Sequence, residues 1–131
     1  MNVFDNASIN LPGFAYRDLL SIDRWESFTL AFTSLTVVGA TTYTGRYRFV
    51  GAQCFFQAQF SAATSVASTA GTTYLALPRA AQGVAGIATM TNGTTKVAVG
   101  TCHIDVTNSR CYPPTQGASG NTFTIAGWFE I

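Results

Sequence analysis

Apolar and polar residues alternate along most of the chain from Ser27 onward. Residues 53–61 show the pattern best, because the apolar side chains there occupy alternate positions: Cys54, Phe56, Ala58 and Phe60. Only Phe55 interrupts the polar set between them. Successive side chains of a strand point to opposite faces of a sheet. The period of two therefore predicts an antiparallel strand with one buried face.

Two other segments carry the same alternation. Residues 42–50 place Gly45, Tyr47 and Phe49 opposite Thr44, Arg46 and Arg48. Residues 121–131 place Phe123, Ile125, Phe129 and Ile131 on one face, and leave Trp128 on the otherwise polar side. In both segments the odd-numbered face is predicted to be the core face.

Further short strands are predicted at 28–33, 72–77, 84–90, 94–99, 102–106 and 109–112. Asn92-Gly93 predicts a hairpin with a type I′ turn, and Thr107-Asn108 marks a second tight turn. The apolar parity switches at Gly100, where a β-bulge is expected. Together these signals predict an all-β domain over residues 27–131, an antiparallel β-sandwich of the jelly-roll type with about eight strands.

Residues 1–26 differ from the rest of the chain. After the Pro12-Gly13 breaker, the spacing of the apolar residues up to Ile22 suggests a short helical turn. We interpret the segment as an N-terminal arm, which is ordered only when something holds it. Two arrangements stay open: the arm lies across its own β-sandwich, or it reaches a neighbouring subunit.

The composition indicates a surface that is covered by other proteins. The chain has 131 residues, of which 47% are hydrophobic and 10% charged, against roughly a quarter charged in an ordinary soluble domain. Such a shortage of charge favours burial by other copies or by another protein. A net charge of +1 with one lysine, Lys96, gives no basic patch for nucleic acid or for an anionic membrane. We therefore expect no nucleic-acid or membrane partner.

The beginning of the chain and the cysteines bear on where the protein is made. Met1 is not followed by a basic and then apolar stretch, so we expect synthesis in the cytoplasm without a signal peptide. Cys54, Cys102 and Cys111 are an odd number of cysteines. This count argues against a disulfide framework and favours small buried thiols in a reducing compartment.

Candidate chemistry is sparse. The absence of any Asp or Glu between Glu26 and Asp105 disfavours paired-carboxylate catalysis and calcium binding. A single histidine, His103, without a Cys-x-x-Cys pair argues against a zinc site. Adjacent strand positions point Cys102 and His103 to opposite faces, which excludes them as a nucleophilic dyad and leaves only Cys54 or Cys111 as a partner for His103. We predict no enzyme activity, no cofactor and no metal site. His103 and Asp105 share a polar face and are interpreted as a surface pair; at a subunit boundary, protonation of His103 would tune assembly.

Several side chains are candidates for an interface. Arg46 and Arg48, expected beside Tyr43, either lie on a solvated face or hold a sugar, a phosphate or a partner carboxylate. Trp128 is either covered by the arm or anchors an interface, since aromatic residues and Arg are enriched where partners bury surface. The candidate interface residues are Phe4, Phe14, Tyr16, Trp25, Arg46, Arg48 and Trp128.

Three stretches together resemble small virion proteins of tailed bacteriophages. They are Tyr43-Thr-Gly-Arg-Tyr-Arg-Phe-Val-Gly-Ala-Gln-Cys-Phe-Phe-Gln, Thr69-Ala-Gly-Thr-Thr-Tyr-Leu-Ala-Leu-Pro and Phe123-Thr-Ile-Ala-Gly-Trp-Phe-Glu. Proteins of this kind occur as capsid cement proteins and as knob domains of tail fibres, and the likeness covers about residues 40–131. The resemblance implies a β-barrel without catalytic residues.

Only about 25 residues precede the predicted barrel, which favours a cement protein over a fibre knob. The resemblance then implies a homo-oligomer, dimer or trimer, that clamps adjacent subunits of the major capsid protein at the capsid surface of the virion. Several modest contacts would add up through avidity. The alternative is a receptor-binding or glycan-binding module of the tail fibre or tail tip, with Arg46, Arg48 and Tyr43 at its site.

Overall fold

The computed structural model describes residues 24–62, 64–83 and 85–131, and within them the chain forms antiparallel strands and no helix. The prediction of an all-β antiparallel domain is confirmed. The predicted helical turn of the arm, together with Phe4, Phe14 and Tyr16, lies outside the described residues. Pairing begins at Glu26, the last residue of the predicted arm.

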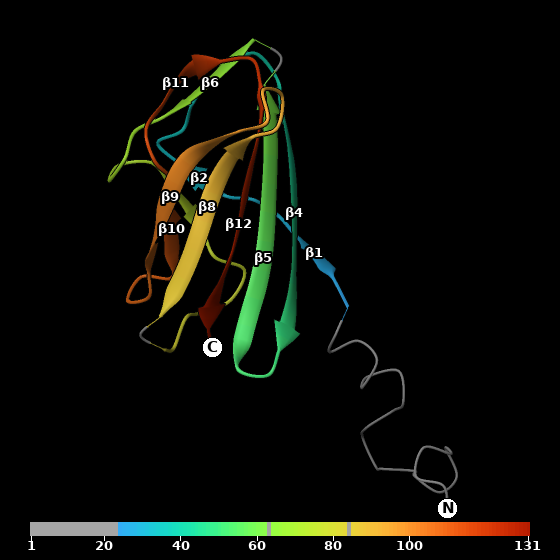
Figure 1. Ribbon diagram of the computed structural model, residues 1–131, viewed down its shortest axis with the longest axis vertical. Helices are drawn as coiled ribbons and strands as arrows, with labels where there is room; N and C mark the ends of the chain where they lie inside the picture. Colours follow the sequence, from blue (N-terminus) through green and yellow to red (C-terminus); the bar gives the residue numbers. More distant parts are fainter. Residues whose placement is uncertain (1–23, 63, 84) are drawn as a thin grey trace, which may run out of the picture.

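Nine strands form one sheet that curls into a half-barrel (Figure 1). The two longest strands, β4 and β5, lie side by side on one side of the curl, and β8 and β9 lie on the other. In spatial order the strands are β1 (Glu26–Phe28), β4 (Thr41–Val50), β5 (Gln53–Ala62), β12 (Thr122–Glu130), β8 (Gly86–Asn92), β9 (Val97–Asp105), β10 (Arg110–Tyr112), β7 (Tyr74–Ala76) and β2 (Phe32–Thr33).

A second, smaller sheet lies at one end of the curl, at the top of Figure 1. Its three strands are β11 (Gln116–Ser119), β6 (Ser65–Ser68) and β3 (Thr36–Val38). Val66 of β6 is buried and belongs to the same hydrophobic cluster as the larger sheet. The small sheet therefore closes one end of a single core.

The core lies inside the curl and is made from the faces that the alternation predicted. Seven apolar residues on these faces of β5 and β12 are at most 1% exposed: Cys54, Phe56, Ala58, Phe60, Phe123, Ile125 and Phe129. The rings of Phe60 and Phe123 stack with 5.6 Å between their centroids. Gly45 is the small residue on this face of β4, because Phe28 and Leu30 fill the space above it.

The predicted strand at 28–33 is wrong as a single element. It divides into β1 and β2, which pair with β4 and β7 at the two opposite ends of the strand order. Leu30, between them, is buried in the core, and the backbone N–H of Ala76 donates a hydrogen bond to the carbonyl of Ala31. This segment therefore bridges the two edges of the curled sheet, which an alternation pattern alone does not indicate.

The predicted strands at 94–99 and 102–106 are one strand, β9. Met90 of β8 pairs with Gly100, whereas Thr91 pairs with Ala98, so Val99 is an extra residue in the ladder. This is the bulge expected at Gly100. It lets Cys102 and Ile104 face the core further along the strand.

The hairpin between β8 and β9 is confirmed, but the predicted type I′ turn is wrong. Positive φ occurs at Lys96, with φ 62°, and not at Asn92 or Gly93. The Asn92 side chain is buried, and its Oδ1 accepts hydrogen bonds from the backbone N–H groups of Thr94 and Thr95. Asparagine is used here for its side-chain acceptor and not for its tolerance of a left-handed backbone.

The tight turn expected at Thr107-Asn108 is present and repeats the same design. The Oδ1 atom of Asp105 accepts from the backbone N–H groups of Thr107 and Asn108, both at 3.1 Å. Ser109 takes the left-handed conformation with φ 55°, four residues after the acceptor, as Lys96 does after Asn92. Both hairpins of the β8–β9–β10 region therefore close through an Asx side chain.

Candidate interaction surface

The outer, convex face of the large sheet carries a line of large side chains. Register places Arg48 opposite Phe55, Phe55 opposite Trp128, and Trp128 opposite Ile87 on four consecutive strands. Directly paired residues share a face of a sheet, and this is the face opposite to the core residues. Ile87 is 52% exposed. A large apolar row on an outer face is unusual for a solvated strand surface.

Trp25, which directly precedes the edge strand β1, extends this row beyond Arg48. Its ring lies 4.6 Å from the guanidinium carbon of Arg46 and 5.1 Å from that of Arg48. The Arg48 guanidinium also lies 5.8 Å from the ring centre of Phe55. These distances are within the range at which the electrons of a ring face attract a guanidinium group. We call the set Trp25, Arg48, Phe55, Trp128 and Ile87 the aromatic row.

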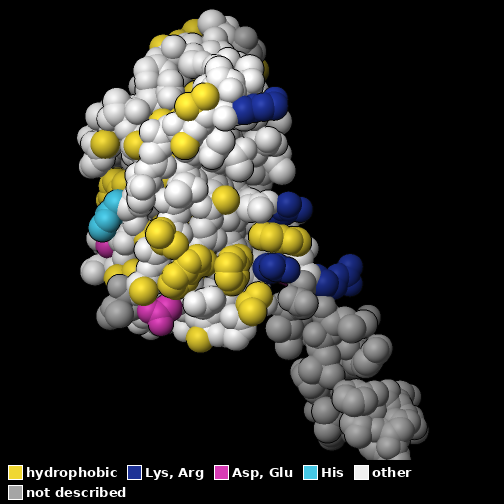
Figure 2. Space-filling view, in the orientation of Figure 1, with side chains coloured by type: hydrophobic (Ala, Val, Ile, Leu, Met, Phe, Trp, Pro, Cys, Tyr) yellow, Lys and Arg dark blue, Asp and Glu magenta, His cyan; other side chains and the backbone are white. Residues whose placement is uncertain are grey.

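The aromatic row borders a shallow groove of about 370 Å³, whose lining includes Trp25, Arg48, Phe55 and Trp128. Figure 2 shows apolar side chains gathered low on this face, over β8, β12 and β5, beside dark-blue basic side chains on the side of β4 and β1. Both tryptophans of the chain belong to the row.

A polar strip lies next to the aromatic row, on the next two outward-facing residue pairs of β4 and β5. It comprises Thr44, Arg46, Gln57, Gln59 and Thr124, which line a groove of about 280 Å³. The Nε atom of Arg46 donates a hydrogen bond of 2.7 Å to the Oε1 atom of Gln57. Within the described part of the chain, the residues lining the two grooves include two arginines and neither Asp nor Glu. The β4 side of the face is therefore cationic.

Four of the predicted interface residues are brought together here: Trp25, Arg46, Arg48 and Trp128. The sequence pattern shows Phe55 only as an exception to the alternation and does not distinguish Ile87, so neither is among the predicted interface residues. The break in alternation at Phe55 is the signal that would have found it, because a phenylalanine among glutamines needs a partner surface. Ile87 offered no comparable signal.

Tyr43 is not part of this surface, contrary to the expectation that it lies beside Arg46 and Arg48. An odd-numbered residue of β4 points to the other face, and the Tyr43 ring packs against Phe32 with 5.9 Å between centroids. Tyr43 stays 42% exposed near the end of the strand. A ligand held by the two arginines would not meet it.

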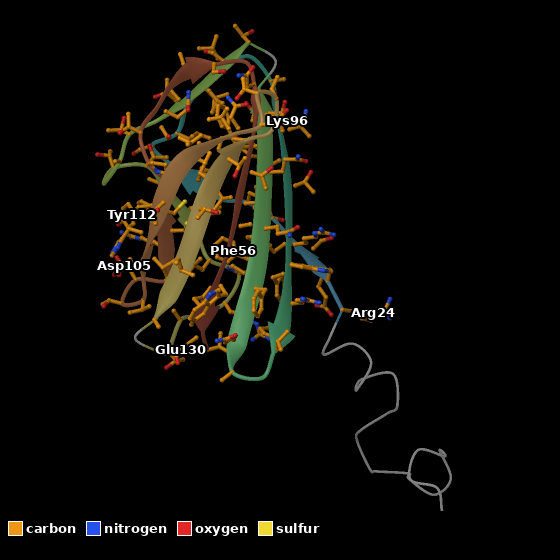
Figure 3. The ribbon with its side chains drawn as sticks, viewed as in Figure 1. Arg24, Phe56, Lys96, Asp105, Tyr112 and Glu130 are labelled. Atoms are coloured by element: carbon orange, nitrogen blue, oxygen red, sulfur yellow. The ribbon has the colours of Figure 1, made fainter. Side chains whose placement is uncertain are left out.

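His103 and Asp105 share the outer side of β9, as expected from their spacing. The side chain of Asn108 and its backbone N–H hold the pKa of the Asp105 carboxyl below its usual value, and the positive charge of His103 contributes least. The His103 ring neighbours Tyr112, at 6.1 Å between centroids, and Arg110 stacks on Tyr74 at 4.1 Å. The Asp105 carboxylate therefore stabilises the β9–β10 turn. Figure 3 shows Asp105 and Tyr112 on the side of the molecule away from Arg24.

The three cysteines are free thiols on the core side, as predicted. Burial raises the pKa of Cys54 to about 11. A hydrogen bond with Cys102, together with burial, raises the pKa of Cys111. Cys102 is 5% exposed whereas His103 is exposed on the opposite face, so these neighbours do not form a nucleophilic dyad.

Among the described residues, no group of three or more His, Cys, Asp or Glu side chains is arranged to hold a metal ion. No helix within that part of the chain is long and apolar enough to span a membrane. No protein-family model matches the chain, and the comparisons with curated proteins and with solved structures likewise gave no match.

Proposed function

We propose that this protein is a structural component of a tailed-bacteriophage virion, and that it attaches to its neighbours through the outer face of the curled sheet. In this proposal it is a capsid cement protein that binds the major capsid protein, and its β-sandwich has jelly-roll connectivity. The observation that carries the proposal is the aromatic row, because Trp, Phe and Arg side chains are enriched at the centres of protein interfaces.

The charge content supports the same function. Charged residues make up 10% of the chain, whereas a free monomer usually keeps a mixed and strongly charged surface. The apolar centre of the row, Phe55, Trp128 and Ile87, lies on three strands that are paired on both sides, β5, β12 and β8, which makes it a rigid platform. A rigid apolar surface loses little conformational entropy on binding, which suits a permanent assembly.

The proposal is tested with phage particles from which the protein has been removed by disrupting its gene. Purified wild-type protein is added back, and the temperature at which the heads release DNA is measured. We expect this temperature to rise with wild-type protein and with Val97→Asp, and to stay low with Ile87→Asp. Val97 is 60% exposed and lies outside the row, so the two substitutions are matched in chemistry. Unchanged DNA release with wild-type protein would reject the cement role.

The polar strip favours a second candidate, a glycan-binding module of the tail fibre or tail tip. An arginine and an amide side chain fixed side by side, here Arg46 and Gln57 at 2.7 Å, can share the hydroxyl groups of one sugar, and Trp25 offers a ring for stacking. For this function, particles lacking the protein would lose adsorption to cells and keep head stability. Arg46→Ala would then weaken binding of the purified protein to host surface polysaccharide.

A further inference from the structure

We propose that the aromatic row is covered by the N-terminal segment of a second copy of this chain, residues 14–22. This inference rests on the proposed function and names the partner that occupies the surface. The acceptor is apolar in its centre, at Phe55, Trp128 and Ile87, and cationic on the β4 side, at Arg46 and Arg48. A matching occupant needs apolar side chains together with a negative net charge.

The sequence of residues 14–23 meets this requirement. It supplies five large apolar side chains, Phe14, Tyr16, Leu19, Leu20 and Ile22, within nine residues. Asp18 stands in the middle of the segment and Asp23 at its C-terminal end, and with Arg17 they give residues 14–23 a net charge of −1. Carboxylates paired with arginines form charge-assisted hydrogen bonds with defined geometry. Apolar contact and charge complementarity therefore point to the same occupant.

The lengths also agree. The row spans three strand spacings from β4 to β8, or about 14 Å at the usual separation of strands. Nine residues reach about 30 Å when extended and about 14 Å as a helix. Either conformation covers the row from Arg48 to Ile87, so the complementarity does not depend on the conformation of the segment.

The way in which the chain approaches the sheet favours a second copy over the same chain. Trp25 lies over Arg46 and Arg48 of β4 and occupies the start of the row. Arg24, one residue earlier, lies outside the edge strand β1 and projects away from the sheet (Figure 3). A segment that covered its own row would have to reverse at this point and pass over the Trp25 ring. The segment of a second copy has no such constraint.

Exchange of segments between copies is tested by charge reversal in the full chain. In one variant Arg46→Glu and Arg48→Glu reverse the acceptor, and in the other Asp18→Lys and Asp23→Lys reverse the segment. We expect wild-type protein to have the mass of two or three chains by light scattering, and each variant alone to have the mass of one. A mixture of the two variants restores opposite charges across the contact, so we expect it to recover assembled species.

The alternatives give different outcomes. If the segment covers its own sheet, mixing leaves both variants as monomers; if another protein covers the row, charge reversal does not change the mass of the wild-type species. Either result overturns the inference. A second measurement avoids the charge reversals, which can themselves reduce stability. Chains with Leu19→Cys are mixed with chains carrying Ile87→Cys, and a disulfide-linked dimer is expected on a non-reducing gel. Failure of exchange in a protein that still binds phage heads would reject this inference and leave the proposed function standing.

Discussion

The guanidinium carbon of Arg46 lies 4.6 Å from the centre of the Trp25 ring. Trp25 directly precedes the edge strand β1, so this contact holds the start of β1 against the outer face of β4. β1 contributes only three paired residues, Glu26, Ser27 and Phe28. Such a short edge strand depends on side-chain contacts for its order. Trp25 therefore connects the start of the described chain with the surface on which the proposed function rests.

Replacing Trp25 with Ala removes its contacts with both Arg46 and Arg48. We expect the free energy of unfolding to fall by about 1 kcal/mol, the usual size of exposed cation–π contacts. Trp25→Phe keeps a ring and is expected to lose less. Urea denaturation at low protein concentration measures the effect without a contribution from assembly. Equal stability of wild-type protein and Trp25→Ala would show that the stacking does not hold the edge.

Asn92 is expected to be a key residue of the β8–β9 hairpin. Asn92→Ala leaves the backbone N–H groups of Thr94 and Thr95 without their acceptor, and we expect a loss of about 1–3 kcal/mol in the free energy of unfolding. Asn92→Ser retains a shorter acceptor and should lose less. Chemical denaturation gives both values, and a larger loss in the serine variant than in the alanine variant would contradict the assignment.

Asp105 gives a pH dependence with a defined sign. Its pKa is lower in the folded protein because Asn108 and Thr107 donate hydrogen bonds to the carboxylate. A lowered pKa stabilises the fold above the ordinary value near 3.9, and this contribution disappears as the pH falls through the folded pKa. We expect Asp105→Asn to lower the thermal unfolding temperature at pH 6 and to differ less from wild-type protein at pH 2. A constant difference across this range would count against the carboxylate.

Gly127 is required by close packing between β12 and β8. A Cβ atom there would meet the carbonyl oxygen of Ile87 and the Cα and Cβ atoms of Ala88, and a backbone neighbour cannot rotate away. We expect Gly127→Ala to cost about 1–3 kcal/mol, the range for overpacked sites. Gly117→Ala is the matched control, since a Cβ atom at Gly117 has no atom within 4 Å. Urea denaturation of the two variants should give clearly different midpoints.

The alternation of side chains predicted which face of each long strand is buried. The core faces of β5 and β12 are those expected, because a shift of one residue would have placed Phe56 or Phe123 in water. The bulge at Gly100 was predictable for the same reason. The sequence does not indicate which strands pair with each other. Residues 28–33 have the pattern of one strand, but the two halves pair with strands at opposite ends of the sheet.

The candidate surface was predicted only in part. Trp128 and the two arginines stood out because each interrupts a polar or neutral pattern on its strand. Their meeting with Phe55 and Ile87 depends on the register between strands that are distant in sequence, such as Trp128 with Ile87. Tyr43 was wrongly added, because odd- and even-numbered positions of a strand lie on opposite faces, and its ring packs against Phe32.

The central claim is that the aromatic row is buried when the protein assembles, and tryptophan fluorescence tests it directly. Both tryptophans of the chain, Trp25 and Trp128, belong to the row, so no other tryptophan contributes to the signal. We expect acrylamide to quench wild-type protein weakly at high concentration and strongly after dilution, whereas Ile87→Asp is quenched strongly at both. Equal quenching of wild-type protein at all concentrations, or in its assembled and dissociated forms, would contradict the claim.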